Sequence, residues 1–567
     1  MKKLPFNVLT VVLSALCLSL SACGGDNSNE PSNPGESSNP AESSEPSIAS
    51  SIPEEQYNIV RPEFTPEYTK YELSPSPVGL NMTYYSDIYS RGFAWVTDKT
   101  AEETELYLVQ SDKGAEADFS NATKIEGETI EFTYQTSGSF VSPSSLLPKS
   151  SGSSNNYELN GYDHRVHVEN LEKGKAYSYK VGSEQGYSYG AFIVEKDSND
   201  SITMLNMSDS QTKDPDKLNV WRNTYSHAVV TAGSDLDFSL HNGDQFDQNI
   251  TKVNSSDQYK PNRFLCYAKA LDVVSDYKFN IPYMTSSGNH EPTAPYSHYL
   301  LNNVDYGGFD YSGGFYSFDY KFAHFTVLNT SLKTVDDAQM KWLKDDLDAA
   351  KDAKWRIVAM HVSPHSTGDN SNKTDIQKLL EKITPVFSEK HVDLVFQAHY
   401  HTYSKTMPYL WDAAGYTTTW EDESVVNMYP ETETINDIVY DKNPEGTYYV
   451  TTGAAGHRCG AAEADGVWAE VVKDGDGWKG LDSSKTFLSN KYKVQLGHIK
   501  YETQYESYKV NGYTSDQHYE VGDLATGNVN AQMFGVLNLT EETLNYSVYT
   551  VNNDTVKLFD SLDVIKD

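Results

Sequence analysis

The chain has 567 residues, and its 80 Asp and Glu against 45 Lys and Arg give a formal net charge of −35. This acidity, without a basic patch in the sequence, argues against binding to a nucleic-acid polymer. The length exceeds what one ordinary hydrophobic core supports, so two or more domains are expected.

The N-terminus has the features of a secretory signal peptide over residues 1–22. Two lysines precede an apolar stretch, residues 8–20, that is too short for a membrane-spanning helix. The Leu-Ser-Ala-Cys sequence at 20–23 resembles the lipobox of bacterial lipoproteins. That resemblance implies lipidation of Cys23 and a lipid anchor that holds the protein on a membrane of the bacterial cell envelope, outside the cytoplasm. An ordinary signal peptide with an incidental cysteine is the alternative.

Two segments of different composition follow the signal. Residues 23–60 are rich in Ser, Asn, Pro, Gly and Glu and too poor in apolar residues to fold, so they predict a disordered tether. Residues 74–196 show strand-like alternation, for example in residues 91–98, which predicts a β-sandwich. The VHVENLEKGKAYSYKVG segment within it resembles fibronectin type III modules. His164 and His167 are predicted to be surface residues of this domain.

The remaining residues, 200–567, combine buried strands with helical patterns. Five apolar runs each end in a polar cluster: ITMLNMSDSQ, LDFSLHNGDQFD, IPYMTSSGNHE, WRIVAMHVSPH and VDLVFQAHYH. Between them, residues 336–353 place apolar side chains on one helical face. This alternation predicts a layered α/β domain whose site lies where strands run into loops. Residues near 408–445 and 460–520 predict surface insertions, and the C-terminus predicts a hairpin turning at 552–553.

The polar side chains at the ends of the five runs are the candidate site residues. Taken singly, each cluster is explained by a turn, a helix cap or a buried histidine. Together they supply carboxylates, amides and imidazoles, which suit two divalent or trivalent metal ions. His399 and His401 stand two residues apart, so in an extended chain they point to the same side. The full set is Asp209, Gln211, Asp244, Asp247, Asn289, His290, Glu291, His361, His399 and His401.

The order of these clusters, D-x-Q, GD-x-x-D, GNHE, H and AH-x-H, resembles the calcineurin-like metallophosphoesterase superfamily. The sandwich before them and the hairpins after them narrow the resemblance to the purple acid phosphatase-like branch. The resemblance implies a four-layer α-β-β-α domain that holds two metal ions, drawn from Fe, Zn, Mn and Mg.

The resemblance also implies a role for each ligand. Asp209 and His401 would bind the first metal, Asp244 would bridge both ions, and Asn289, His361 and His399 would bind the second. His290 would contact the phosphate or the leaving-group oxygen, stabilise its charge and donate a proton. A hydroxide that bridges the two metals would be the nucleophile.

Four residues leave alternatives open. Purple enzymes have a Tyr at the position of Asp247, so the resemblance implies a colourless enzyme here. Many superfamily members have His at the position of Gln211, which here either binds the first metal or lines it. Asp247 either ligates that metal or forms a hydrogen bond with His290. Glu291 either orients His290 or caps a helix, and it is also a candidate for substrate binding. His365 is either a substrate-contacting residue or a loop residue without a role.

The expected activity is hydrolysis of small phosphate monoesters outside the cytoplasmic membrane. A phosphodiesterase acting on nucleotide, lipid head-group or wall-polymer esters is the second hypothesis. A non-catalytic surface binding protein with a relic site is the third. The sequence leaves open the oligomeric state and the pairing of Cys266 with Cys459, which form either one disulfide or two thiols.

Overall fold

The computed structural model describes the chain from residue 73 onward, with gaps. The described residues fall within one compact unit, residues 55–567. The predicted signal, the tether and Cys23 lie outside them, so lipidation stays a prediction. Cys459 also lies outside them, so both alternatives for Cys266 and Cys459 stay open. The described ranges are 73–85, 87–135, 139–141, 158–196, 200–212, 215–246, 263–278, 280–291, 314–365, 374–401, 403–411, 425–428, 430–456, 468–474, 477–487, 532–552 and 555–567.

The N-terminal part of this unit is a sandwich of two antiparallel sheets. The first sheet has the order β1 (Val78–Thr83), β2 (Arg91–Thr97), β7 (Glu158–Val168), β5 (Glu128–Gln135) and β6 (Ser139–Val141). The second has the order β4 (Thr123–Glu126), β3 (Glu105–Gln110), β8 (Ala176–Ser183) and β9 (Gly186–Ile193). Aromatic and aliphatic side chains from both sheets fill the space between them. The likeness to fibronectin type III modules stays a prediction.

His164 corrects one expectation, because its side chain is buried inside the sandwich. Side chains alternate along a strand, and on β7 His164 shares its face with the buried Val166 and Val168. Its ring nitrogens each lie 2.7 Å from a threonine hydroxyl, those of Thr97 and Thr104. The predicted surface position was therefore wrong for His164.

The C-terminal part is built on two further sheets. The eight-stranded sheet has the order β12 (Tyr283–Thr285), β11 (Phe238–His241), β10 (Ile202–Met207), β25 (Gln532–Leu539), β26 (Thr543–Asn552), β27 (Thr555–Ile565), β21 (Ile438–Lys442) and β20 (Glu431–Ile435). The six-stranded sheet has the order β13 (Tyr316–Tyr320), β14 (Ala323–Val327), β15 (Trp355–Val362), β16 (Leu394–Ala398), β22 (Tyr448–Thr452) and β17 (Tyr403–Lys405). Both sheets are mixed. The strands that lead into the site are parallel within each sheet, β10–β12 in the first and β14–β16 in the second.

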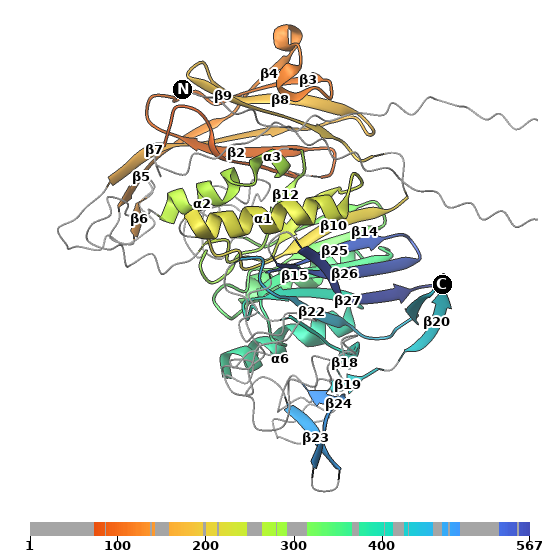
Figure 1. Ribbon diagram of the computed structural model, residues 1–567. Coiled ribbons are helices and arrows are strands. Elements are labelled where there is room, and N and C mark those ends of the chain that lie inside the picture. The colour runs from red at the N-terminus through yellow and green to blue at the C-terminus, as the bar shows by residue number, and fades with distance from the viewer. Residues whose placement is uncertain are drawn as a thin grey trace, which may run out of the picture. The chain divides into compact units, whose positions relative to one another are not determined.

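Helices cover the outer face of each sheet (Figure 1). On the eight-stranded sheet lie α1 (Pro215–Ala232), α2 (Arg263–Asp272) and the short α3 (Ser275–Lys278). On the six-stranded sheet lie α5 (Asp337–Ala349) and α6 (Thr374–Glu389), whose apolar faces pack on β15 and β16. The helix expected over 336–353 is confirmed, and Asp336 caps it by accepting a hydrogen bond from the Gln339 N–H at 2.7 Å. None of the helices in the described ranges has the length and hydrophobicity to cross a membrane.

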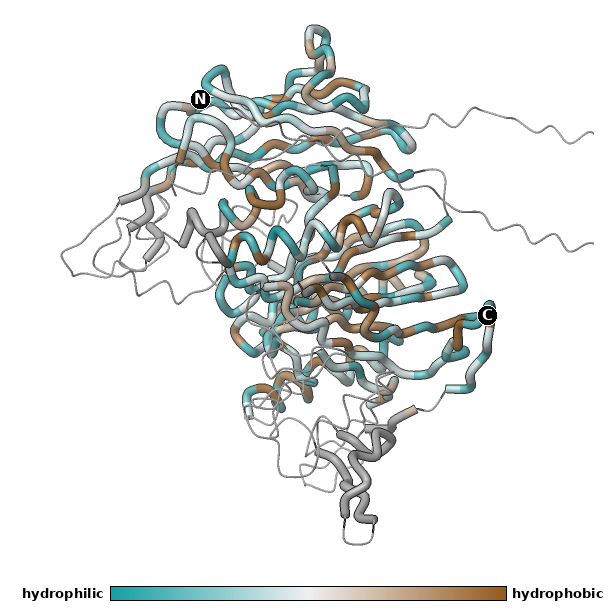
Figure 2. Tube along the Cα trace, in the orientation of Figure 1, coloured by the Kyte–Doolittle hydropathy of each residue, from teal (hydrophilic) through white to brown (hydrophobic). Residues whose placement is uncertain are grey.

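A shared core lies between the two sheets. The rings of Phe238 on β11 and Phe325 on β14 meet edge to face at 5.2 Å between centroids. Figure 2 shows hydrophobic segments concentrated along these strands. The layers therefore follow the expected α-β-β-α order, with mixed sheets.

The sandwich contacts the eight-stranded sheet and its helices through β1. The Gly79 N–H donates to Asp272 Oδ1 on α2 at 2.6 Å. Tyr84 packs its ring on Phe238 and Phe318, with centroids 5.8 and 5.4 Å apart. One hydrophobic cluster thus runs from the sandwich into the layered part.

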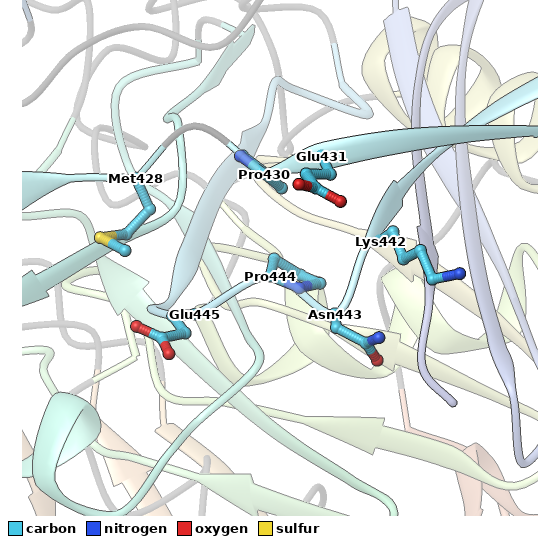
Figure 3. A pocket seen from close by; sticks show the side chains of 7 residues that line it. All are labelled: Met428, Pro430, Glu431, Lys442, Asn443, Pro444 and Glu445. Atoms are coloured by element: carbon cyan, nitrogen blue, oxygen red, sulfur yellow. The ribbon is translucent and has the colours of Figure 1, made fainter.

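Part of the expected insertion at 408–445 belongs to a sheet. β20 and β21 pair antiparallel and extend the eight-stranded sheet beside β27. The expected C-terminal hairpin is confirmed by the antiparallel pairing of β26 with β27. Two small antiparallel pairs complete the described strands, β18 (Tyr409–Trp411) with β19 (Val425–Asn427), and β23 (Trp468–Asp474) with β24 (Gly477–Phe487). Beside β20 and β21 lies a pocket of about 310 Å³, whose seven lining residues (Figure 3) include none of the candidate site residues.

Candidate metal centre

The loops that follow β10 and β11 continue the parallel pairing of these strands. The Asp209 N–H donates to the Gly243 carbonyl, and the Gln211 N–H donates to the Asp244 carbonyl, both at 3.0 Å. The carboxyl ends of neighbouring parallel strands meet at one edge of a sheet, where ligands commonly bind. This ladder therefore brings Asp209, Gln211 and Asp244 together at that edge.

The backbone at the site adopts an unusual conformation. Five site residues that are not glycine have positive φ angles, 52° at Asp209, 40° at Gln211, 56° at Asp244, 78° at His399 and 58° at His401. Each such conformation costs on the order of 1–3 kcal/mol and persists only where the surrounding structure enforces it. Strain of this kind is typical of ligand sites.

Two groups of side chains have the arrangement of metal ligands. In the first group, one ligand atom each from Asp209, Asp244 and His401 lies within 4.8 Å of the others. In the second group, the same holds for Asp244, His361 and His399. Asp244 belongs to both groups, as a bridging carboxylate must.

Asn289 completes the second group, and a backbone contact orients its central histidine. Asn289 Oδ1 lies 3.1 Å from His361 Nε2, which is also 3.3 Å from Asp244 Oδ2. On the other side of the ring, His361 Nδ1 lies 2.7 Å from the Asn242 carbonyl oxygen. A hydrogen bond there protonates Nδ1 and leaves Nε2 as the ligand atom.

Buried atoms without a partner show that metal ions fit this site. Within the described part of the chain, Gln211 Oε1 and His399 Nδ1 are buried and accept or donate no hydrogen bond. Leaving such atoms unsatisfied is costly, and cations bound to the two groups would provide partners for them. The donor types are carboxylate, amide oxygen and imidazole, which ligate divalent metals.

The charges of the groups agree with cation binding. Burial raises the pKa of both Asp209 and Asp244. Neighbouring histidines, chiefly His401 for Asp209 and His361 for Asp244, lower the pKa by more than burial raises it, so both pKa values lie below the usual range. Burial lowers the pKa of His399 to about 3, which keeps this ring neutral. Burial also lowers the pKa of His361, but Asp244 outweighs it and raises the pKa to about 9. A cation would displace that proton, because a histidine ligates only in its neutral form.

His290 lies at the accessible rim of the centre. Its backbone N–H donates to Asp244 Oδ1 at 2.8 Å, and its Nδ1 lies 3.1 Å from the Phe246 carbonyl oxygen. Its Nε2 lies 3.6 Å from Asp244 Oδ2, and the side chain is 11% exposed. The ring therefore lies beside the shared carboxylate at the open side of the centre.

Glu291 has a role that was not among the expected alternatives. Its carboxylate is fully buried and accepts hydrogen bonds from the backbone N–H groups of Asp244, Gln245 and Gly288 at 2.6, 2.7 and 2.7 Å. It therefore ties the loop after β12 to the loop after β11. A side chain in this position is closed to substrate, which corrects the expectation of substrate contact.

His365 also differs from the expectation of substrate contact. Its ring is fully buried, and Nε2 lies 2.5 Å from the Tyr409 hydroxyl while the ring packs against Tyr449. These contacts join β18 and β22 to the loop after β15. Asp247 lies outside the described residues, so its two alternatives stay open.

Two residues of the centre escaped the sequence interpretation. The Asn242 carbonyl orients His361, as described above. Gly288 lies so close to the bridging carboxylate that a Cβ there would be 2.2 Å from Asp244 Oδ1. The GD and GNHE motifs are the sequence signal for both, because Asn242 stands two residues before Asp244 and Gly288 stands directly before Asn289.

Parts of the chain are similar in sequence to known proteins. Residues 202–403 match the Calcineurin-like phosphoesterase family. The chain is 26% identical over 320 residues to acid phosphatase type 7 of Mus musculus, covering 52% of this chain and 64% of that protein. It is 26% identical over 196 residues to purple acid phosphatase 21 of Arabidopsis thaliana, covering 32% and 38%. The chain thus spans less than two thirds of the length of these relatives.

A solved structure shares the fold. Purple acid phosphatase PPD1 from yellow lupin (Lupinus luteus) seeds aligns with a TM-score of 0.53 at 15% identity, covering 87% of this chain and 75% of that one. The chain therefore contains a calcineurin-like metallophosphoesterase domain. Its homologues include purple acid phosphatases, and its fold is of the purple acid phosphatase type.

Proposed function

We propose that this protein is a two-metal phosphomonoesterase that hydrolyses small phosphate esters. The observation that carries the proposal is the pair of ligand groups that share Asp244. Two cations held by these groups would supply Lewis acidity to a phosphoryl group and acidify water for the attack. The phosphatase relatives support the same reaction class.

The residues of the chain have separate tasks in this proposal. Asp244 holds the two ligand groups in register, and Glu291 fixes the backbone beneath it. His361 is oriented by the Asn242 carbonyl, so it binds without rearrangement. His290 contacts the phosphoryl or leaving-group oxygen, stabilises its charge and donates a proton to it.

The charge of the whole chain makes the metal centre necessary for phosphate binding. A formal charge of −35 repels an anionic substrate. Metal ions are commonly the largest local charges in such a site, and they reverse the sign of the potential there. Substrate binding as well as chemistry should therefore require metal.

The test is an assay of residues 54–567 with para-nitrophenyl phosphate and its bis-ester, after loading with Mn²⁺, Zn²⁺, Fe²⁺ or Mg²⁺. Asp244→Asn removes the shared carboxylate, and we expect it to lower monoester turnover by more than the roughly 10–100-fold that loss of an outer-shell partner costs. Asp319→Asn, which alters an exposed carboxylate on β13, is the matched control and should retain activity. Full activity in Asp244→Asn would contradict the proposal. Faster turnover of the bis-ester would favour a phosphodiesterase.

We also propose that the protein acts outside the cytoplasmic membrane, held there by lipid on Cys23. The signal-like N-terminus and the Leu-Ser-Ala-Cys sequence support this location. In a bacterial host, Cys23→Ser should move the protein from the membrane fraction to the soluble extracytoplasmic fraction. An unchanged membrane fraction would rule out the lipid anchor.

A further inference from the structure

The strand that follows the paired histidines is short and stands at the edge of its sheet. β17 has three residues, begins two residues after His401 and pairs antiparallel with β22. A shift of this pairing by one residue would turn every side chain of the strand to its other face. It would also move the preceding loop by about 3.3 Å, the rise of one strand residue. We therefore expect side-chain contacts to fix the register of so short a strand.

Two side chains of β17 converge on one carboxylate in the eight-stranded sheet. Tyr403 and Lys405 are two residues apart on the strand and so point to the same side. The Tyr403 hydroxyl donates to Asp560 Oδ2 at 2.7 Å, and Lys405 Nζ lies 2.9 Å from the same oxygen. Lys405 Nζ also donates to the Ser561 carbonyl oxygen at 2.7 Å. Both partners of this ion pair are buried, so the contacts tie β17 to β27 inside the core.

A β-bulge in β27 turns Asp560 towards these side chains. Leu558 and Asp560 stand opposite consecutive residues of β26, so Phe559 between them is an extra residue. A bulge of this kind re-aims the side chains beside it. Phe559 and Asp560 are both buried, although neighbours on a regular strand point to opposite faces. The Phe559 ring also meets the Tyr403 ring edge to face, with centroids 5.2 Å apart, so the bulge receives β17.

We propose that Asp560 is a positioning residue for the metal centre, because by fixing the register of β17 it holds His401 at the first ligand group. The inference rests on the metal centre of the proposed function. His401 lies two residues before Tyr403, and its Nε2 lies 3.2 Å from Asp209 Oδ1. A buried ion pair commonly adds little net stability compared with apolar residues of the same volume, but its directional contacts can specify register. The C-terminal strand thus acts on the centre through His401.

The experiment measures the affinities of both cations in the folded protein by chelator competition with Zn²⁺. Asp560→Asn keeps the shape of the side chain and removes its charge. It should weaken one cation, the first, by about 10–100-fold, as loss of an outer-shell partner does. Combined with His401→Ala, it should cause no further loss, because the residue through which it acts is gone. Combined with His361→Ala, which disrupts the second ligand group, it should keep its full effect on the first cation.

Two further variants separate positioning from stability. Asp276→Asn is the matched control, because Asp276 forms an ion pair with Arg222 between α3 and α1, and it should leave both metal affinities unchanged. If Asp560→Asn does not fold, the triple variant Tyr403→Phe, Lys405→Met and Asp560→Leu replaces the network by apolar side chains of similar size. It should retain stability but still weaken the first cation about 10-fold.

The outcomes distinguish this inference from the proposed function. Native affinity for the first cation in Asp560→Asn or in the triple variant would overturn the positioning role. So would an equal loss with and without His401, or an equal loss in Asp276→Asn. Fewer than two cations in the native protein would instead overturn the metal centre itself.

Discussion

Glu291 joins two loops of the centre, and its carboxylate has the same sign of charge as the carboxylate of Asp244. Burial and then repulsion by Asp244 raise its pKa to about 8. Its carboxylate nevertheless accepts hydrogen bonds from three backbone N–H groups, which favour the charged form. Cations at the centre would resolve this conflict, because they stabilise both carboxylates at once. Glu291 is therefore a positioning residue whose effect should appear in metal affinity.

Replacement of Glu291 by Gln should weaken metal binding by about 10–100-fold. The amide nitrogen would face a backbone N–H that now donates to the carboxylate, so the Asp244 backbone would shift. Competition with a chelator measures the effect on the full protein. Glu195→Gln is the control, because this buried glutamate contacts Tyr89 and Lys173 in the sandwich. Equal metal affinity in the two variants would show that the backbone contacts of Glu291 do not position the ligands.

At the scale of elements, the sandwich and the layered part are joined by the contact of β1 with α2. Gly79 has a φ angle of 67°, and a Cβ at this position would lie 2.7 Å from the Ala268 Cα. Only glycine permits both the backbone conformation and the close approach. Tyr84 follows on the same segment and enters the core between the two sheets. We therefore expect the two parts to unfold in a single transition.

Gly79→Val tests this contact, with Gly233→Val as its matched control. Gly233 has a similar φ angle of 78°, but a Cβ there meets nothing within 4 Å. Both variants suffer backbone strain, and only Gly79→Val forces β1 away from α2. We expect it to lower the free energy of unfolding by on the order of 2 kcal/mol more than the control, measured by urea denaturation. If both variants lose the same free energy of unfolding, the contact between β1 and α2 adds nothing to the cost of the backbone conformation.

At the scale of the whole molecule, buried neutral histidines set the response of stability to acid. Burial lowers the pKa of His164 to about 4, although Asp163 opposes this, while an unfolded histidine has a pKa near 6.5. Between these values the unfolded chain binds a proton that the folded chain does not. Stability is therefore full above about pH 6.5 and falls as the pH drops towards 4, by about 3 kcal/mol at most from this residue.

His164→Asn should flatten that dependence. The variant loses the titrating ring, so its free energy of unfolding should fall less between pH 6.5 and 4 than that of the native protein. Denaturation in urea at several pH values gives both curves. If the free energy of unfolding falls equally with pH in both proteins, groups other than His164 cause the acid sensitivity. The residue lies in the sandwich, so metal binding at the centre should not change.

The layered fold and the candidate residues of the centre can be predicted from local sequence patterns. Apolar runs that end in Asp209, Asp244, Asn289, His361 and His399 predict strand ends, and parallel strands bring their ends to one edge. Helix α5 and the C-terminal hairpin follow from local periodicity and turn chemistry, which depend on neighbouring residues alone. These features are local, so they can be read along the chain.

The surroundings of each of these residues depend on the tertiary structure. Glu291 accepts hydrogen bonds from residues 46 and 47 positions away, and His365 contacts a tyrosine 44 positions away. His164 is buried because β7 turns that face towards the second sheet of the sandwich. Gln211 has an unsatisfied oxygen only because the paired loops after β10 and β11 enclose it. Burial and hydrogen-bond partners are set by segments distant in sequence, and local patterns carry no information about them.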